Sequence, residues 1–311
     1  MDILKQRIHS SVYKQLSEAG IGSLKTILLK NELALGQCTK LNHDEIRNIV
    51  EEAADIVLKQ ELQSASEIPA WPRLFTGCDS IDSIIHGGIP VNGITEIVGS
   101  SGVGKTQLCL QLSLTSQFPL NLGGLDKGVV YICTEDTFPS KRLMQLVQTF
   151  PLQFTELQKI KFGDNIYIQH VSDFEQLRRC LYIRLPQLLA HRKIGLIIID
   201  SIAGAFRSEN VDVDYTNRSQ ELSAIASQLN KLGEMYGVAV VCTNQVTDNI
   251  KTGASEPCLG LAWSNLITCR FGIRRHFDSV RLFEVIFAPD LPNISCKFII
   301  KDYGLDGIKN V

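Results

Sequence analysis

Glycine, lysine and threonine stand at a phosphate-binding spacing in residues 99–106, where the sequence satisfies the pattern GxxxxGK[ST]. The eight residues are Gly99, Ser100, Ser101, Gly102, Val103, Gly104, Lys105 and Thr106. In such a loop, backbone N–H groups wrap the phosphates, the lysine reaches the β- and γ-phosphates, and the threonine hydroxyl contacts Mg²⁺. An apolar run precedes the stretch and a helical period follows it, as the motif requires. We therefore predict that these residues bind ATP and Mg²⁺.

Three polar residues at the ends of apolar runs are candidates to complete this site. Asp200 closes GLIIID and is either a plain strand terminus or, with Thr106, a holder of the Mg²⁺ shell. Glu135 closes VVYICTE and is either an acid at a helix start or the group that polarises the attacking water. Gln245 closes VAVVCTNQ on the same edge and is expected at the γ-phosphate or its water. The predicted catalytic residues are Glu135, Lys105 and Gln245.

Strands and helices alternate along the part of the chain that carries these residues. Apolar, β-branched runs predict strands at 94–98, 129–133, 166–169, 196–199 and 238–242. Helical periods lie at 105–117, 141–150, 174–191 and 220–236. Continuous hydrophobicity is typical of parallel strands covered on both faces. Residues 266–301 predict three further strands, an antiparallel extension of the sheet.

The first residues have a different character from the rest of the chain. Short amphipathic helices are predicted at 12–20, 23–33 and 43–59, the last opened by Asn42 with Glu45 three residues on. The polar segment that follows ends with two prolines around Trp71 and is typical of a linker. We predict a helical domain over 1–58, a linker over 59–73 and an α/β ATPase domain over 74–311.

The composition limits which classes of protein and which kinds of site the chain can represent. The 311 residues are 44% hydrophobic and 21% charged, which predicts a globular chain. Nine scattered cysteines without CxxC spacing argue against a disulfide framework and a zinc site, and six histidines show no ligand spacing. We find no apolar leader and no apolar run near the roughly 20 residues of a membrane span, so we expect a soluble, intracellular protein without a membrane partner. The net charge of −2 leaves any nucleic-acid binding to local clusters of Lys and Arg.

The order of P-loop, TED, LIIID and TNQV resembles the RecA-type recombinases, in particular their eukaryotic and archaeal branch. The N-terminal segments KQLSEAGIGSLKTILLK and NHDEIRNIVEEAA are similar to that branch's helix-hairpin-helix domain. More narrowly, GGLDKGVVYICTEDTFPSKRL and EPCLGLAWSN resemble the paralogues of the eukaryotic recombinase. The resemblance covers nearly the whole chain and implies a RecA-like P-loop core with a small helical domain.

The resemblance also implies roles for residues that spacing alone does not identify. Arg142, in the TFPSKRL segment, matches an arginine that stacks on adenine, and Pro292, with Asp290 nearby, matches a proline that caps the nucleotide of a neighbouring subunit. Two loops of the family bind DNA. Their cations here are Arg207 and Arg218 in the first loop (207–220) and Lys251 in the second (246–261). On composition alone, loops that are solvated and bind nothing remain the alternative.

Two departures separate the chain from the recombinases proper. Trp263 stands where they have a histidine that links γ-phosphate to DNA, and an indole offers one donor and no acceptor. The alternative is that Trp263 packs in the core or at a subunit interface. The recombinases dock onto a neighbour through a linker Phe-x-x-Ala, whereas no Phe occurs between residues 56 and 74 here. A distinct partner is therefore favoured over self-polymerisation.

These features predict an ATP- and DNA-binding recombinase paralogue that acts in homologous-recombination repair of double-strand breaks. By resemblance, its partners are a sister paralogue of the C type in a heterodimer, the recombinase filament, and single-stranded or branched DNA. We expect weak, DNA-stimulated ATP hydrolysis, and location in the nucleus and also in the cytoplasm. Two alternatives stay open: an assembly subunit in which ATP is only structural glue, and a self-assembling recombinase or helicase motor.

Overall fold

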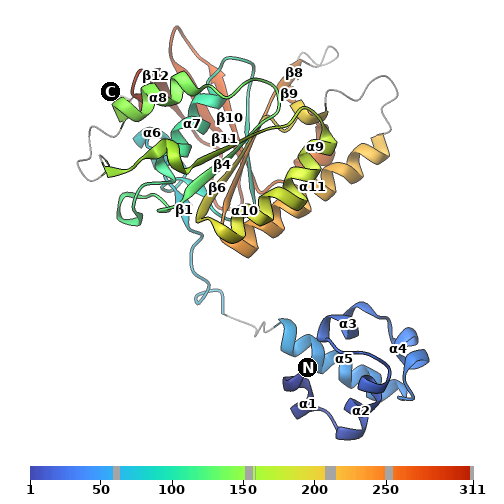
Figure 1. Cartoon of the computed structure of the whole chain (residues 1–311). Coiled ribbons are helices and arrows are strands. Elements are labelled where there is room, and N and C mark those ends of the chain that lie inside the picture. Colours follow the sequence, from blue (N-terminus) through green and yellow to red (C-terminus); the bar gives the residue numbers. More distant parts are fainter. Residues whose placement is uncertain (59–63, 151–156, 158, 207–214, 249–254, 309–311) are drawn as a thin grey trace. The chain divides into compact units, whose positions relative to one another are not determined.

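The computed structural model describes residues 1–58, 64–150, 157, 159–206, 215–248 and 255–308. The chain divides into two compact units, Met1–Ala70 and Trp71–Val311 (Figure 1).

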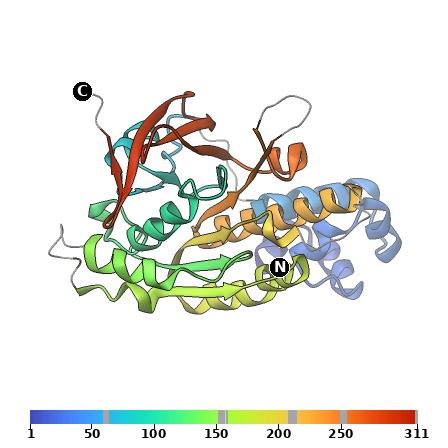
Figure 2. The same ribbon diagram turned by 90° about the horizontal axis from the view of Figure 1, so that it is seen from above.

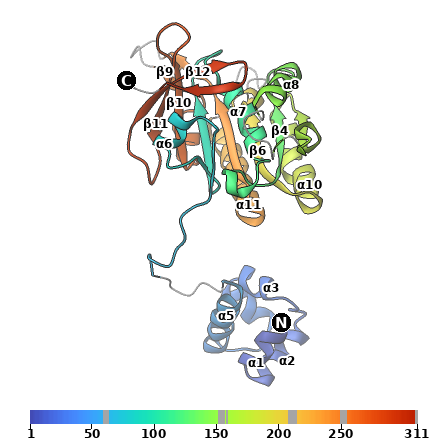
Figure 3. The ribbon, with the colours of Figure 1, turned by 90° about the vertical axis from the view of Figure 1, so that its left-hand side faces the viewer.

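The N-terminal unit is a cluster of short helices. They are α1 (Asp2–Arg7), α2 (Ser10–Glu18), α3 (Leu24–Leu29), α4 (Glu32–Cys38) and α5 (His43–Leu58). Figure 3 shows these helices gathered in one cluster. Their apolar side chains form one core that includes Leu16, Ile27 and Ile49. At the start of α5, the backbone N–H of Asn42 donates to Glu45 Oε2 and the N–H of Glu45 donates to Asn42 Oδ1, both at 2.9 Å. This reciprocal pair fixes where the longest helix of the unit begins.

The single helix predicted over residues 23–33 is wrong, because the chain forms two helices there. Asn31 interrupts the period, and its Oδ1 accepts a hydrogen bond of 2.8 Å from the backbone N–H of Ala34. Asparagine at this position satisfies a donor of the next helix and so favours a new start over continuation. Helix α1, which sequence reasoning did not predict, lies just before α2 in the chain.

A nine-stranded sheet forms the centre of the second unit, in the order β13-β12-β11-β10-β3-β7-β6-β4-β5. Its parallel strands are β3 (Ile94–Val98), β4 (Gly128–Cys133), β5 (Ile166–His170), β6 (Ile194–Asp200) and β7 (Ala239–Asn244). Every residue of β3, β4 and β7 is buried, whereas burial alternates along the edge strand β5. The predicted parallel core is therefore confirmed, and its continuous apolar runs are the strands covered on both faces.

Helices cover both faces of this sheet (Figure 1). One layer holds α6 (Asp79–Ile84), α7 (Lys105–Thr115) and α8 (Ser140–Thr149). The other holds α9 (Phe174–Arg179), a π-helical turn η5 (Cys180–Arg184), α10 (Leu185–His191) and α11 (Tyr215–Tyr236). Each layer has its own buried apolar core, with the sheet between them. This arrangement brings the carboxyl ends of the parallel strands to one edge, where α7 begins.

The C-terminal strands extend the sheet, and Figure 2 shows them, in red, at the end of the sheet remote from β5. They are β10 (Cys269–Arg275), β11 (Arg281–Phe287), β12 (Ser295–Lys301) and β13 (Gly304–Gly307). Strand β10 runs parallel to β3, and the later pairs are antiparallel. The predicted antiparallel extension is confirmed. It has one strand more than predicted. Strand β13 is only four residues long and follows a tight turn, so its sequence pattern is too short to predict a strand.

Smaller elements complete the unit. They are the strand pairs β1 (Arg73–Leu74) with β2 (Ile89–Pro90) and β8 (Val246–Asp248) with β9 (Ser255–Pro257), helix α12 (Gly260–Ser264), and 3₁₀ turns at Leu120–Leu122, Phe162–Asn165 and Gly204–Phe206. All nine cysteines are free thiols. Burial raises the pKa of the Cys78 thiol to about 11 and, with the charge of Asp200, that of Cys133 to about 12, so both stay protonated at neutral pH. Within the described part of the chain, no helix is long and apolar enough to cross a membrane.

Candidate nucleotide site

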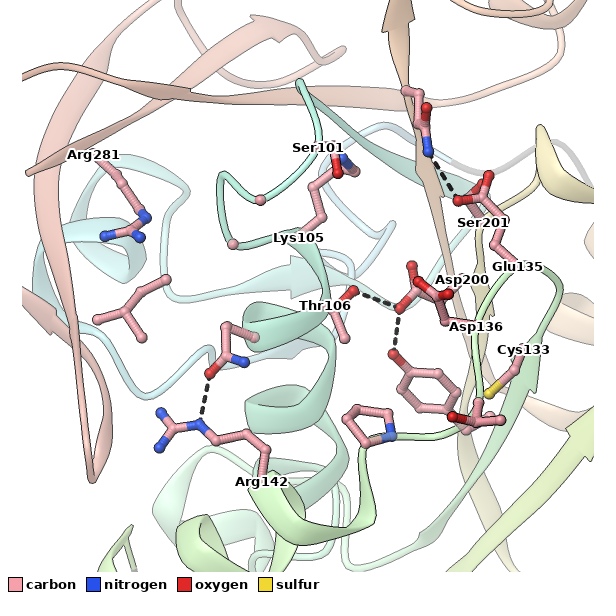
Figure 4. A pocket seen from close by; sticks show the side chains of 18 of the residues that line it. Ser101, Lys105, Thr106, Cys133, Glu135, Asp136, Arg142, Asp200, Ser201 and Arg281 are labelled. Atoms are coloured by element: carbon pink, nitrogen blue, oxygen red, sulfur yellow. Dashed lines mark hydrogen bonds between the residues drawn. The ribbon is translucent and has the colours of Figure 1, made fainter. Parts of the chain in front are cut away.

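A cavity of about 570 Å³ opens where the parallel strands end and α7 begins (Figure 4). Most of the residues singled out by their spacing line it, together with Arg142, which the resemblance indicated. They are Ser101, Gly102, Gly104, Lys105, Thr106, Glu135, Arg142, Asp200 and Gln245. In Figure 4, Lys105 and Thr106 lie in the middle, with Glu135 and Asp200 on one side and Arg142 and Arg281 on the other.

The P-loop backbone excludes side chains at two of its glycines. A Cβ on Gly99 would lie 2.2 Å from the carbonyl oxygen of Ile273, and one on Gly104 would lie 2.6 Å from Ile300 Cδ1. Gly104 also has φ of +116°, in the region that favours glycine. These residues let the loop lie close against β10 and β12.

Lys105 begins α7 and is 8% exposed. Its Nζ donates to the carbonyl oxygens of Gly99, at 2.7 Å, and Ser100, at 2.9 Å. Burial lowers the pKa of Lys105, and the negative charges of Asp200 and Glu135 oppose that shift. The ammonium group is thus held inside the loop by neutral carbonyls, which a phosphate can replace as a stronger partner.

Asp200, at the end of β6, collects three hydroxyl donors. Thr106 Oγ1 donates at 2.8 Å and Tyr131 OH at 2.6 Å to Oδ2, and Thr243 Oγ1 donates at 2.6 Å to Oδ1. Burial and the charge of Asp200 raise the pKa of Tyr131 well above its ordinary value, so the phenol remains a donor. The carboxylate is thereby fixed beside the Thr106 hydroxyl, and the two groups present the hard oxygen atoms that Mg²⁺ prefers.

Glu135, just after β4, is oriented by two neighbours on its two oxygens. Ser201 Oγ donates to Oε1 and Gln245 Nε2 donates to Oε2, both at 2.8 Å. These partners come from the ends of β6 and β7, so three strand ends converge on one carboxylate. Such an arrangement can hold a general base or a water-orienting acid in place.

The opposite side of the cavity carries two arginines. Arg142 of α8 donates to Gln107 Oε1 at 2.7 Å and Gln145 Oε1 at 2.6 Å, and to the carbonyl oxygens of Lys301 and Asp302 at 2.7 and 2.9 Å. Four bonds fix the plane of its guanidinium, as stacking on a base requires.

Arg281 of β11 donates from Nε to the carbonyl oxygen of Val103 at 2.8 Å and from Nη1 to that of Ser279 at 2.7 Å. Burial lowers its pKa, and the nearby charge of Arg275 adds to this. Because Arg281 lines the cavity, it adds a positive charge on the P-loop side opposite Glu135.

The remaining predicted residues lie apart from the cavity or outside the described residues. Pro292 is exposed and does not line the cavity, and nearby Asp290 forms an ion pair with Arg73. The guanidinium of Arg218, on α11, lies 5.7 Å from the centroid of the Phe206 ring. Arg207 and Lys251 lie outside the described residues.

Trp263 is buried in the core with no exposed surface. Its indole N–H donates to Glu96 Oε1 at 2.8 Å. Of the two alternatives drawn from the sequence, packing in the interior is the one that the structure supports.

Sequence reasoning missed Tyr131, Thr243, Ser201 and Arg281 as site residues. Tyr131 is the one polar aromatic residue of an otherwise apolar strand, Ser201 adjoins Asp200, and Thr243 lies two residues before Gln245. Those positions are signals that could have identified them. Arg281 carries no local signal, since it reaches the P-loop only through pairing of strands far along the chain.

Comparison with known proteins identifies the family. The Rad51 family model matches residues 71–308. The chain belongs to the Rad51 family. This Rad51-family chain is 33% identical to DNA repair protein XRCC3 of Mus musculus, with 99% of the chain and 98% of the relative covered. It is 31% identical to DNA repair protein rhp57 of Schizosaccharomyces pombe, over 93% of the chain and 94% of the relative. It is 33% identical to the XRCC3 homolog of Arabidopsis thaliana, over 78% and 95%. The predicted family and RecA-like fold are confirmed.

Proposed function

We propose that this Rad51-family chain binds ATP and Mg²⁺ in the cavity and acts in homologous-recombination repair of DNA double-strand breaks. The observation that carries the proposal is the convergence of Lys105, Thr106, Asp200 and Glu135 on one cavity from two strand ends and a helix start. The names of the similar proteins, DNA repair proteins XRCC3 and rhp57, support the repair role.

The residues present fit the nucleotide and its metal. The P-loop supplies N–H groups and the start of α7, both favourable for phosphate. Thr106 Oγ1 and Asp200 Oδ2, 2.8 Å apart, supply oxygen atoms on one side. No cluster of three or more metal-ligating side chains occurs among the described residues, which suits Mg²⁺, since that ion usually takes one or two protein carboxylates and completes its shell with water and substrate phosphates. When bound, the metal would neutralise charge on the phosphates.

The chemistry assigned to the chain's own residues is hydrolysis. Glu135 orients a water and accepts its proton on the carboxylate oxygen that Gln245 leaves, while Ser201 continues to hold the other oxygen. Lys105 leaves its carbonyl partners and donates to the phosphates, and Arg142 stacks on the adenine. We assign a weak rate, because Lys105 and Glu135 both hold protein partners that must be exchanged first.

Partners are proposed from the family resemblance. The chain pairs with a sister paralogue of the C type, assists the recombinase filament, and binds single-stranded or branched DNA through the loops that contain Arg207, Arg218 and Lys251. Pro292 caps the nucleotide of a neighbouring subunit, which would couple ATP binding to assembly. A repair role implies the nucleus, with a cytoplasmic fraction also proposed.

The test is to purify the chain with and without the candidate sister paralogue and to measure ATP turnover and single-stranded DNA binding. Glu135→Gln should leave ATP affinity within about twofold and lower turnover by at least about 100-fold, because it removes a proton acceptor without changing shape. Glu234→Gln, an exposed glutamate on α11, is the matched control and should behave as wild type.

Two results would redirect the proposal. If Glu135→Gln leaves turnover and repair intact, hydrolysis is not the chain's task and ATP serves as structural glue. Long filaments of the isolated chain on DNA, with strand exchange, would instead establish the self-assembling recombinase.

A further inference from the structure

A carboxylate without solvent access lies on β3, the strand that leads into the P-loop. Glu96 is fully buried. Its Oε1 accepts from Asn244 Nδ2 at 2.7 Å and Trp263 Nε1 at 2.8 Å, and its Oε2 accepts from Arg270 Nε at 2.5 Å. These four residues, which we call the Glu96 cluster, come from β3, β7, α12 and β10. The ion pair with Arg270 offsets the cost of burying the charge.

Asn244 joins this cluster to the residue that contacts Glu135. Its Oδ1 accepts a hydrogen bond of 2.8 Å from the backbone N–H of Gln245. Its Nδ2, besides reaching Glu96, donates to the carbonyl oxygen of Cys258 at 2.7 Å, and the N–H of Cys258 donates to the carbonyl oxygen of Gln245 at 2.8 Å. The Asn244 amide therefore cannot rotate without releasing Glu96, Gln245 or Cys258.

Gln245 connects Asn244 to the cavity wall. Its side chain donates to Glu135 Oε2 at 2.8 Å, while its backbone is held by Asn244 and Cys258. Hydrogen bonds thus link the indole of Trp263 through Glu96 and Asn244 to the backbone of Gln245, and the Gln245 side chain continues the path to Glu135. Its two ends lie in different surroundings, one in the core and one at the cavity wall.

An indole at position 263 supplies what a phenyl ring would lack. Its N–H is the second donor on Glu96 Oε1, and buried polar atoms that lose a partner are costly. Trp263 also stands on α12, directly after the strand pair β8–β9 whose base is formed by Gln245 and Cys258. Its indole thus contacts Glu96, while its helix continues the segment that leaves the strand pair.

We propose that Asn244 and Trp263 are positioning residues for Gln245, and that nucleotide binding is transmitted through Gln245 and Asn244 to the Glu96–Trp263 hydrogen bond. This inference rests on the proposed function, since it requires nucleotide in the cavity. Partner exchange at Glu135 when the cavity fills moves the Gln245 side chain, and the shared amide of Asn244 passes that movement to the buried cluster. Loss of the indole donor lets Glu96 Oε1 shift, and Asn244, which donates to the same oxygen, shifts with it and misaligns Gln245.

The sequence contains only two tryptophans, Trp71 and Trp263, so fluorescence can be restricted to Trp263 by one substitution. Trp71→Phe removes the exposed one, so that emission from the full chain reports Trp263 alone. The protein is titrated with Mg²⁺ and ATP, and with Mg²⁺ and ADP, while binding is measured separately by calorimetry. We expect the emission of Trp263 to change along the calorimetric ATP curve, and this change to be lost when Glu96→Gln is added in the same background.

A kinetic measurement keeps the inference testable if Glu96→Gln folds poorly. In the complex with the sister paralogue, Trp263→Phe should lower kcat about tenfold and leave KM for ATP within about twofold, the pattern of a group that acts beyond ground-state binding. Leu261→Ala, an exposed residue on the same short helix, is the control and should change neither value.

The outcomes separate this inference from the function on which it rests. ATP binding by calorimetry with no change in Trp263 emission, together with an unchanged kcat for Trp263→Phe, overturns the inference and leaves the proposed function standing. If calorimetry detects no ATP binding at all, both are overturned.

Discussion

Two buried or half-buried carboxylates, Asp200 and Glu96, each accept hydrogen bonds from three side chains but have opposite surroundings. Asp200 lies at a cavity wall, and its donors are hydroxyl groups. Glu96 is sealed in the core, and its donors are an amide, an indole and a guanidinium. Hydroxyl groups can exchange a carboxylate for a metal or water at modest cost, whereas a buried ion pair resists separation. The first region is suited to ligand binding and the second to holding strands in register.

The largest expected effect is a difference in the free energy of unfolding between variants of the two carboxylates. Glu96→Ala should lower the free energy of unfolding by about 3–5 kcal/mol, because Arg270 is left buried without its partner. Asp200→Ala should cost less, about 1–3 kcal/mol, since it leaves neutral hydroxyl groups rather than a charged group without a partner. Urea denaturation followed by Trp263 emission in the Trp71→Phe background measures the second unit specifically. Equal losses for the two variants would contradict the distinction.

A second prediction concerns the charge on the far side of the P-loop. Arg281→Gln should weaken ATP binding about tenfold, or about 1.4 kcal/mol, through loss of a cation that lines the cavity. Calorimetric titration measures it, with Arg178→Gln, an exposed arginine on α9, as the control. Because the effect is electrostatic, it should shrink as salt is raised. If Arg281→Gln binds ATP with wild-type affinity at low salt, Arg281 does not contribute to nucleotide binding.

The smallest expected effect is the uptake of a proton when ATP binds. Burial holds the pKa of Lys105 below its ordinary value, and bound polyphosphate raises it again. Between those two pKa values the complex carries a proton that the free protein lacks, so binding takes up protons and affinity falls as pH rises through that window. Calorimetry in two buffers of different ionisation enthalpy measures the uptake.

Lys105→Arg provides the control for that measurement, because a guanidinium stays charged throughout. Uptake should vanish in this variant if it still binds ATP. Uptake of the same size in Lys105→Arg would assign the proton to another group.

The two regions also differ in how well the sequence predicts them. Residues 99–106 and the strand ends at Asp200 and Gln245 carry local signals, and the parallel core follows from continuous apolar runs. The Glu96 cluster carries none, because Glu96 sits in an ordinary strand and meets Arg270 at a separation of 174 residues. Only the pairing of β3 with β7 and β10 brings its members together. The prediction of a single helix over residues 23–33 failed for a local reason, because the capping side chain of Asn31 begins a second helix within one apolar period.

The most direct test of the account is Mg²⁺-dependent ATP binding by the full chain. Lys105→Ala should weaken binding at least about 100-fold, because the charge-assisted bonds to phosphate are lost. Lys141→Ala, an exposed lysine on α8, should bind as wild type. In the wild-type chain, removing Mg²⁺ should weaken binding as well, and in Asp200→Asn this dependence on Mg²⁺ should disappear. Binding by Lys105→Ala at wild-type affinity would contradict the assignment of this cavity as the nucleotide site.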